Sequence, residues 1–217
     1  MQRTDLTDSV IESLAERVRP YLTELRYGHT RAVEREAAAL GGIYCPEKIP
    51  SLRVSALLHD ITKRLPMPEQ IRLCGEFGIP VTDEDRRSPS VFHAMTGAAV
   101  AARDFSDIVD DEILSGIRWH TTGRAGMTLF ESLIYLADYI EETRTFDDCV
   151  RLRRLFWDGI GAGAKPKKVL TDVMIESFDA TIRGLLKDGA PIAADTVAAR
   201  NDYILRKNAA AETQFVR

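Results

Sequence analysis

Histidine and aspartate in the segment SALLHDITKRLP, residues 55–66, stand where an apolar helical stretch is expected to end. His59 and Asp60 are adjacent. Lys63 follows Asp60 by three positions and is expected on the same face of the helix as Asp60. Removing such a polar pair from water costs free energy unless a hydrogen bond, a metal ion or a substrate satisfies it. The dipeptide alone is weak evidence, because four histidines and 18 aspartates in 217 residues give about 0.3 such pairs by chance.

The three other histidines also lie beside apolar residues, in the strings RYGHT, SVFHAM and GIRWHT. Each one taken singly is more often a hydrogen-bonded core histidine than a ligand. Asp138 is a further anomaly, because YLADYI surrounds its carboxylate with apolar residues, whereas Glu141 and Glu142 fall at the polar end of the same predicted helix. A buried carboxylate needs a cation or several donors, and an ion pair with an arginine is the structural alternative to a ligand.

Together these residues form a set of nitrogen and oxygen donors without thiolates, which suits two ions of iron, manganese, zinc or another first-row metal. The predicted ligands are His29, His59, Asp60, His93, His120 and Asp138. We expect His29, His59 and Asp138 around one ion and His93 and His120 around the other, with the Asp60 carboxylate between them. Six side chains leave coordination positions open to water or phosphate, as a catalytic site requires.

Several separate helices must converge to bring these donors together. Apolar residues recur at spacings of three and four along most of the chain, and strict alternation is hard to find, so the sequence predicts an all-α helical bundle. One helix is expected from about residue 29 to residue 40, with Gly41 and Gly42 as its C-terminal cap. Another is expected to start after Thr128 and to carry Asp138. The run RLRR, residues 151–154, is interpreted as a solvated helix face.

The composition narrows the class of protein. A length of 217 residues with 45% apolar residues fits a folded chain of one or two domains, and we expect a single domain over 1–217. Its metal-binding core would cover about residues 20–150, with C-terminal helices over about residues 150–208 packed on it. A net charge of -4 argues against a nucleic-acid partner.

Three isolated cysteines suit a reducing compartment better than a disulfide framework. The first residues lack the features of a signal peptide, and no apolar run is long enough to cross a membrane. We therefore expect a cytoplasmic protein without a membrane partner, and a homo-oligomer stays open.

The ordered strings RYGHT, LLHDITK, FHAMTGA, IRWHTTGRAGM and YLADYIEETR resemble the HD-domain phosphohydrolases. More specifically, they resemble the YqeK-type symmetrical dinucleoside tetraphosphate hydrolases, over about residues 20–205. The two longest strings are the most specific. This resemblance implies an all-α HD fold with a two-metal centre, often iron, that cleaves diadenosine tetraphosphate into two molecules of ADP. It also implies that the same six side chains bind the metals.

The hypothesis for the mechanism is in-line attack by a metal-held hydroxide on an inner phosphorus, with Asp60 bridging the ions. Lys63 and Arg144 are predicted to bind phosphate groups of the substrate during catalysis. Thr122 and Gly123 are predicted to offer it a hydroxyl and a backbone N–H. Each has a plainer explanation: a solvated lysine for Lys63, for example, and a helix cap for Gly123.

Other functions remain open at the level of the sequence. One is another HD-type phosphohydrolase, acting on nucleoside monophosphates or on a cyclic nucleotide. A second is a non-catalytic nucleotide sensor that keeps its metals for structure. A third is a helical interaction protein whose histidines belong to the core. Product analysis and metal analysis separate these alternatives.

Overall fold

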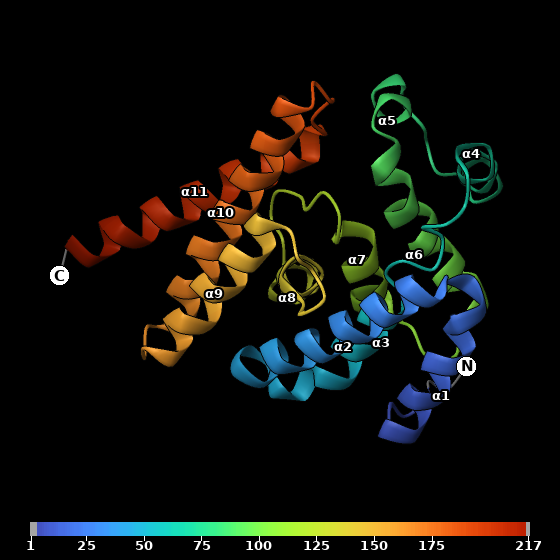
Figure 1. Ribbon diagram of the computed structural model, residues 1–217, viewed down its shortest axis with the longest axis horizontal. Coiled ribbons are helices and arrows are strands. Elements are labelled where there is room, and N and C mark those ends of the chain that lie inside the picture. The colour runs from blue at the N-terminus through green and yellow to red at the C-terminus, as the bar shows by residue number, and fades with distance from the viewer. Residues whose placement is uncertain (1–3, 216–217) are drawn as a thin grey trace.

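The computed structural model describes residues 4–215, and the side chains of residues 4–209. Within this range the chain forms α-helices joined by turns and short 3-10 segments, and no strand, so the prediction of an all-α fold is confirmed (Figure 1). The helices are α1 Asp8–Val18, α2 Glu24–Tyr44, α3 Ile49–Leu58, α4 Met67–Glu76, α5 Asp83–Arg87, α6 Phe92–Asp104, α7 Asp111–Trp119, α8 Leu129–Ile140, α9 Asp147–Gly161, α10 Pro166–Lys187 and α11 Ala194–Phe215.

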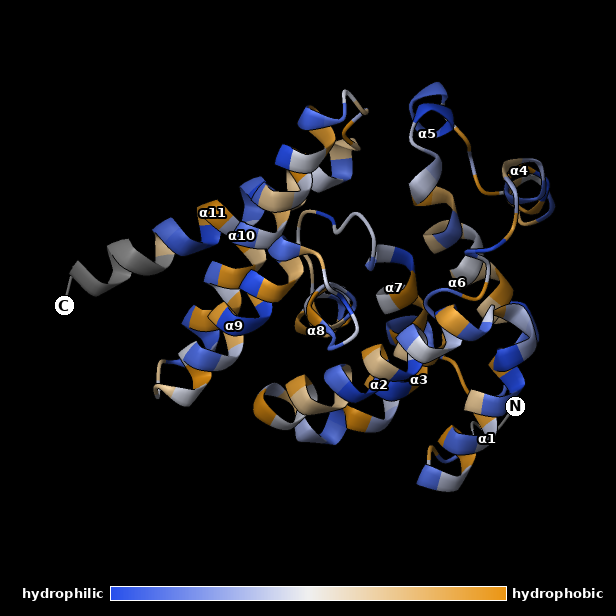
Figure 2. Ribbon diagram, viewed as in Figure 1, coloured by the Kyte–Doolittle hydropathy of each residue, from blue (hydrophilic) through white to orange (hydrophobic). Residues whose placement is uncertain are grey.

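Helix α8 lies at the centre of the bundle and is seen nearly end-on in Figure 1. It packs against α2, α3, α7, α9 and α10. Leu133, Leu136 and Ile140 are fully buried along it, whereas Leu129 at its first position stays 41% exposed. Figure 2 shows hydrophobic and hydrophilic residues together along the helices around it, as expected of amphipathic helices that share a core.

The start of α8 follows from its own sequence. The Thr128 hydroxyl accepts a hydrogen bond from the backbone N–H of Glu131, and the Glu131 carboxylate accepts one from the backbone N–H of Thr128. This reciprocal capping box satisfies two backbone donors that a helix start leaves without partners. The predicted N-cap is confirmed, and it fixes the register that places Asp138 in the last turn.

The predicted end of α2 was wrong. The helix continues through Gly41 and Gly42 to Tyr44, and neither glycine has a positive φ. A Cβ atom at Gly41 would lie 2.8 Å from Cδ1 of Leu52 and 3.0 Å from Cγ1 of Ile49. Gly41 therefore permits a close approach between α2 and α3 rather than a left-handed cap.

A second close contact joins α3 to α7. A Cβ atom at Gly116 would lie 2.6 Å from Oγ of Ser55 and 2.8 Å from Cε1 of Phe130. The Ser55 hydroxyl also donates a hydrogen bond of 3.1 Å to the Ile113 carbonyl of α7. This contact brings together two helices that are each followed directly by a histidine.

The main hydrophobic cluster runs from α1 to α11 through residues of nearly every helix between them. This continuity is compatible with the predicted single domain, which stays a prediction. None of the helices in the described part of the chain combines the length and apolar character needed to cross a membrane.

Candidate metal centre

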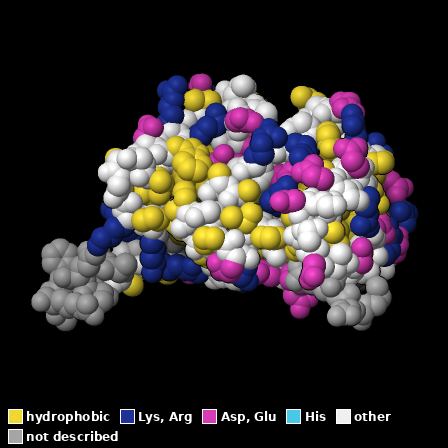
Figure 3. Space-filling model, turned by 90° about the horizontal axis from the view of Figure 1, so that it is seen from below, with side chains coloured by type: hydrophobic (Ala, Val, Ile, Leu, Met, Phe, Trp, Pro, Cys, Tyr) yellow, Lys and Arg dark blue, Asp and Glu magenta, His cyan; other side chains and the backbone are white. Residues whose placement is uncertain are grey.

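Six polar side chains meet in one cluster at the ends and turns of five helices. His29 lies in α2, His93 in the first turn of α6 and Asp138 in the last turn of α8. His59 and His120 directly follow α3 and α7. The four histidines are at most 8% exposed, and no histidine reaches the described surface in the view of Figure 3.

Asp60 lies at the centre of this cluster, in the turn after α3, and is 2% exposed. Its Oδ2 atom is 3.3 Å from Nε2 of His59 and 3.8 Å from Nε2 of His29. Its Oδ1 atom is 3.3 Å from Nε2 of His93 and 3.7 Å from Nε2 of His120. The two oxygens of one carboxylate thus face two different pairs of imidazoles.

Asp138 faces one of these pairs. Its Oδ1 atom is 3.0 Å from Nε2 of His29 and 3.8 Å from Nε2 of His59. His29, His59 and Asp138 each offer one donor atom within 4.8 Å of the others, as do His59, Asp60 and His120. The first group is the one expected from the sequence. The second group contains His59 where the sequence predicted His93. The two groups therefore share the imidazole of His59, and each has its own carboxylate.

Backbone carbonyls orient two of the imidazole rings. Nδ1 of His59 is 2.6 Å from the Ala56 carbonyl, and Nδ1 of His120 is 2.7 Å from the Ile117 carbonyl. Because a carbonyl only accepts hydrogen bonds, each Nδ1 carries a proton, and Nε2 is the nitrogen that faces the cluster. This is the arrangement that metal-binding histidines use.

The donor set fits metal ions. Nε2 of His29 and Nε2 of His59 are buried and have no hydrogen-bond partner among the described residues, although carboxylate oxygens lie beside both. When the rings are neutral, their Nε2 lone pairs and the carboxylate oxygens are all acceptors, and either ring protons or a bound cation satisfies them. Imidazole with carboxylate suits first-row divalent ions, and the site therefore has the chemistry to hold them.

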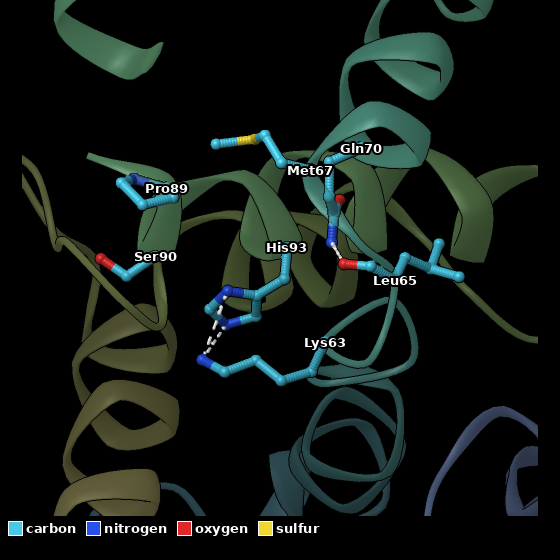
Figure 4. Close-up of a pocket in the computed structure, with 7 residues that line it drawn as sticks. All are labelled: Lys63, Leu65, Met67, Gln70, Pro89, Ser90 and His93. Atoms are coloured by element: carbon cyan, nitrogen blue, oxygen red, sulfur yellow. Dashed lines mark hydrogen bonds between the residues drawn. The ribbon is translucent and has the colours of Figure 1, made fainter. Parts of the chain in front are cut away.

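Three basic side chains border the carboxylates and imidazoles. Nη1 of Arg26 is 3.0 Å from Oδ2 of Asp60, and Nη2 of Arg144 is 2.5 Å from Oδ1 of Asp138. Nζ of Lys63 is 3.0 Å from Nε2 of His93 (Figure 4). Arg26 was not predicted from the sequence as a site residue, although it lies one helical turn before His29 on the same face of α2.

These surroundings shift the pKa values of the cluster. Burial would raise the pKa of Asp60 and Asp138, but His59 beside Asp60 and Arg144 beside Asp138 hold both pKa values well below the usual range. Burial would lower the pKa of His29, but contacts with Asp138 and Glu141 outweigh it and raise this pKa to about 9. Burial lowers the pKa of His93 to about 4. The two carboxylates are therefore ionised at neutral pH.

The comparisons with known proteins agree with this geometry. The model of the HD domain matches residues 26–143, from Arg26 to just beyond the end of α8. A Bacillus subtilis protein named symmetrical bis(5'-nucleosyl)-tetraphosphatase is 33% identical over 184 residues, which cover 85% of this chain and 92% of that protein. The chain belongs to the HD-domain family of symmetrical bis(5'-nucleosyl)-tetraphosphatases.

Another such tetraphosphatase, from Halalkalibacterium halodurans, is 34% identical over 190 residues, which cover 88% of this chain and 95% of that protein. A crystal structure from Clostridium acetobutylicum, described as a predicted HD superfamily hydrolase involved in NAD metabolism, superposes with a TM-score of 0.79. It is 33% identical and the match covers 90% of this chain and 97% of that one. The structural likeness thus extends beyond residues 26–143, the part matched by the HD domain.

A pocket of about 290 Å³ adjoins the cluster of this tetraphosphatase family member (Figure 4). It is lined by Lys63, Leu65, Met67, Gln70, Pro89, Ser90 and His93. Two hydrogen bonds hold the side chain of Gln70 in the pocket wall. Its amide donates to the Thr62 carbonyl at 2.7 Å and accepts from the Thr96 hydroxyl at 2.5 Å. Lys63 and His93 belong both to the pocket and to the surroundings of Asp60.

The structure places the other predicted site residues differently. Helix α3 ends at Leu58, so Asp60 and Lys63 share the following turn rather than a helix face. Gly123 has a φ of 64°, and a Cβ atom there would lie 2.8 Å from the Phe178 ring. The hydroxyl of Thr122 donates to the Gly123 carbonyl at 2.9 Å. These contacts give both residues a structural role, and their contact with substrate stays a prediction.

Thr121, the residue before this pair, reaches the cluster. Its hydroxyl lies 3.1 Å from Nε2 of His93 and 3.0 Å from Nε2 of His120. It was missed because a threonine that follows a helix is more often a surface or capping residue. Its position directly after His120, a predicted ligand, is the sequence signal that could have found it.

Proposed function

We propose that this protein hydrolyses dinucleoside tetraphosphates symmetrically and converts diadenosine tetraphosphate into two molecules of ADP. The observation that carries this proposal is the convergence of four imidazoles and two carboxylates on one buried centre bordered by Arg26, Lys63 and Arg144. Relatives that match most of the chain and bear the name of this activity support the choice of substrate.

The proposed ligands are the six side chains of the sequence prediction, holding two ions, with iron as the first candidate and manganese or zinc as alternatives. When bound, such ions would supply Lewis acidity that activates water near neutral pH and offsets charge on the phosphoryl oxygens. The three cysteines are buried and unpaired, which is compatible with a reducing cytoplasm as the place of the reaction.

The basic residues would bind the tetraphosphate. The Arg26 side chain is 35% exposed and that of Arg144 is 27% exposed, so both can face an anion from the rim of the cluster while contacting a carboxylate within it. Lys63 would bind a further phosphate from the side of the pocket. Cations on several sides of the chain of phosphates would place the central phosphoanhydride over Asp60.

The reaction balances as a simple hydrolysis. Water attacks one inner phosphorus in line with the central bridging oxygen, a P–O bond forms, and the bond from that phosphorus to the bridging oxygen breaks. The bridging oxygen leaves as the terminal oxygen of the second ADP. One water molecule is consumed, and one proton is released to the solvent or retained by the products according to pH.

The test is hydrolysis of diadenosine tetraphosphate in water enriched in oxygen-18 by metal-loaded protein. The expected products are two ADP molecules per substrate, with one labelled oxygen in the β-phosphate of half of the ADP. ATP together with AMP would refute symmetrical cleavage. Parallel assays with nucleoside monophosphates and cyclic nucleotides separate the proposal from other HD-type hydrolases. Asp60→Ala, with its helical content checked by circular dichroism, is the inactive control.

A further inference from the structure

Glu141 is a fully buried carboxylate just after the end of α8, with 0% exposure. The sequence interpretation of this residue as part of a polar helix end was wrong. Its Oε1 atom lies 3.0 Å from Nδ1 of His29, on the side of the ring opposite to the atom that faces Asp138. Glu141 therefore contacts a proposed metal ligand without being one of the six donors.

The Glu141 carboxylate is itself held by its neighbour. The backbone N–H of Thr143 donates to Oε2 at 2.5 Å, and the Thr143 hydroxyl donates to Oε1 at 2.7 Å. A buried carboxylate with these donors has its charge compensated and its orientation fixed. The oxygen that faces His29 cannot rotate away without losing these hydrogen bonds.

Helix α9 holds the turn that carries Glu141. Nε of Arg153 donates to the Ile140 carbonyl at 2.5 Å, and Nη2 donates to the Arg144 carbonyl at 2.9 Å and also to the Glu141 carbonyl. These carbonyls belong to the C-terminus of α8 and the turn after it, where helix carbonyls lack backbone partners. Arg153 thus binds the end of α8 and the turn after it, which corrects the interpretation of RLRR as a solvated helix face.

We propose that Glu141 is a positioning residue for His29. By accepting the Nδ1 proton it fixes the ring so that Nε2 points to Asp138 and to the metal, and Thr143 holds Glu141 in place. This inference rests on the proposed metal centre and adds to it the residue that orients one of its ligands. A neutral imidazole has one N–H group, and the partner of one nitrogen decides which nitrogen is free to bind metal.

Glu142 provides a matched control. It is the next residue in the chain and the same chemical group, but its side chain is 68% exposed and pairs with Arg35 on the surface. Glu141→Gln and Glu142→Gln therefore remove one negative charge each from adjacent positions. Only the first substitution replaces the charged acceptor beside Nδ1 of His29 with a neutral amide oxygen.

The experiment measures metal binding without substrate, by competition between the metal-free protein and a chromophoric chelator for Mn²⁺ or Zn²⁺. Glu141→Gln is expected to bind metal about 10–100-fold more weakly than the wild type, and Glu142→Gln within about twofold of it. Equal affinities of the two variants would overturn the inference. So would wild-type protein that binds no metal, which would also refute the proposed centre.

Two further measurements keep the inference testable if Glu141→Gln folds poorly. Thr143→Val removes the hydroxyl that holds Glu141 while leaving Glu141 in place, and is expected to weaken metal binding about twofold to tenfold. In Zn²⁺-loaded wild type, nitrogen-15 spectra of the histidines should show His29 protonated at Nδ1. Protonation at Nε2 instead would refute the assignment. Metal binding that depends on Glu141 in a protein unable to cleave diadenosine tetraphosphate would support this inference and refute the proposed function.

Discussion

The Nε2 atoms of His93 and His120 lie 3.0 Å apart. The other nitrogen of His120 donates to the Ile117 carbonyl, so its Nε2 presents a lone pair to His93. Two ring nitrogens at this distance repel each other unless a proton or a cation lies between their lone pairs. The Oδ1 atom of Asp60 adds a negative charge at the same place, 3.3 Å from Nε2 of His93. We propose this pair as the position of the second metal ion.

Replacing His93 with alanine should lower the metal content of the protein from two ions per chain to one. The substitution removes a donor from this position, while His29, His59 and Asp138 on the other side of Asp60 stay intact. Elemental analysis after metal loading and desalting gives the stoichiometry directly. Retention of two ions in the variant, or a single ion in the wild type, would contradict the division of the donors proposed here.

Lys63→Ala should slow hydrolysis of diadenosine tetraphosphate without removing the metal. Lys63 lies beside His93 at the pocket, so its loss removes a cation that would face the phosphates. The expected fall in kcat/KM is about 10–100-fold, equivalent to about 1.4–2.8 kcal/mol of transition-state stabilisation. Arg64→Ala is the matched control, because Arg64 lines a separate groove. An equal change in kcat/KM for both variants would show that Lys63 is an ordinary surface lysine and does not bind the substrate.

Glu36→Gln should stabilise the protein at pH 8 but not at pH 4.5. Burial raises the pKa of Glu36 to about 7, against the hydrogen bond that it accepts from Trp157 at 2.9 Å. A carboxyl whose pKa is raised by folding contributes full stability below its unfolded value near 4.5, and loses that contribution as pH rises through 7.

Glutamine imitates the protonated form of Glu36 at every pH. The expected gain in the free energy of unfolding at pH 8 is on the order of 1–2 kcal/mol, allowing for partial exposure of the side chain. Urea denaturation of the wild type and variant at the two pH values measures the difference. A gain of the same size at both values would show that ionisation of Glu36 is not its cause.

Much of the candidate centre follows from residue chemistry alone. Burying histidines and aspartates among apolar residues costs free energy unless hydrogen bonds or a metal ion satisfy them. This reasoning selected the six side chains that the fold brings together. Local rules also fixed the start of α8, because the capping box at Thr128 needs only residues close in sequence.

The residues around the donors could not be predicted in the same way. Arg26 and Glu141 are ordinary charged residues in sequence, and their roles depend on which helix ends lie opposite them. Gly41 and Gly116 likewise resemble a cap and a weak helix position until the neighbouring helix is in place. Tertiary packing determines the roles of these residues, and the local periodicity of a sequence does not give the distance between two helices.

Gly116→Ala tests whether the spacing of α3 and α7 sets the geometry of the centre. The added methyl group would overlap the side chains of Ser55 and Phe130. We expect relief of this overlap to move α3 and α7 apart, and the ends of these helices place the rings of His59 and His120 4.9 Å apart. Overpacking of this kind costs about 1–3 kcal/mol in the free energy of unfolding. We also expect weaker binding of metal, measured by chelator competition.

Gly42→Ala on α2 is the matched control, because a Cβ atom there meets nothing within 4 Å. Alanine favours a helix over glycine by up to about 1 kcal/mol, so this variant should be as stable as the wild type or slightly more stable. Denaturation of both metal-free variants separates the cost of overpacking from the effect of metal. If Gly116→Ala unfolded and bound metal like Gly42→Ala, the close contact of α3 with α7 would not be what holds His59 and His120 together.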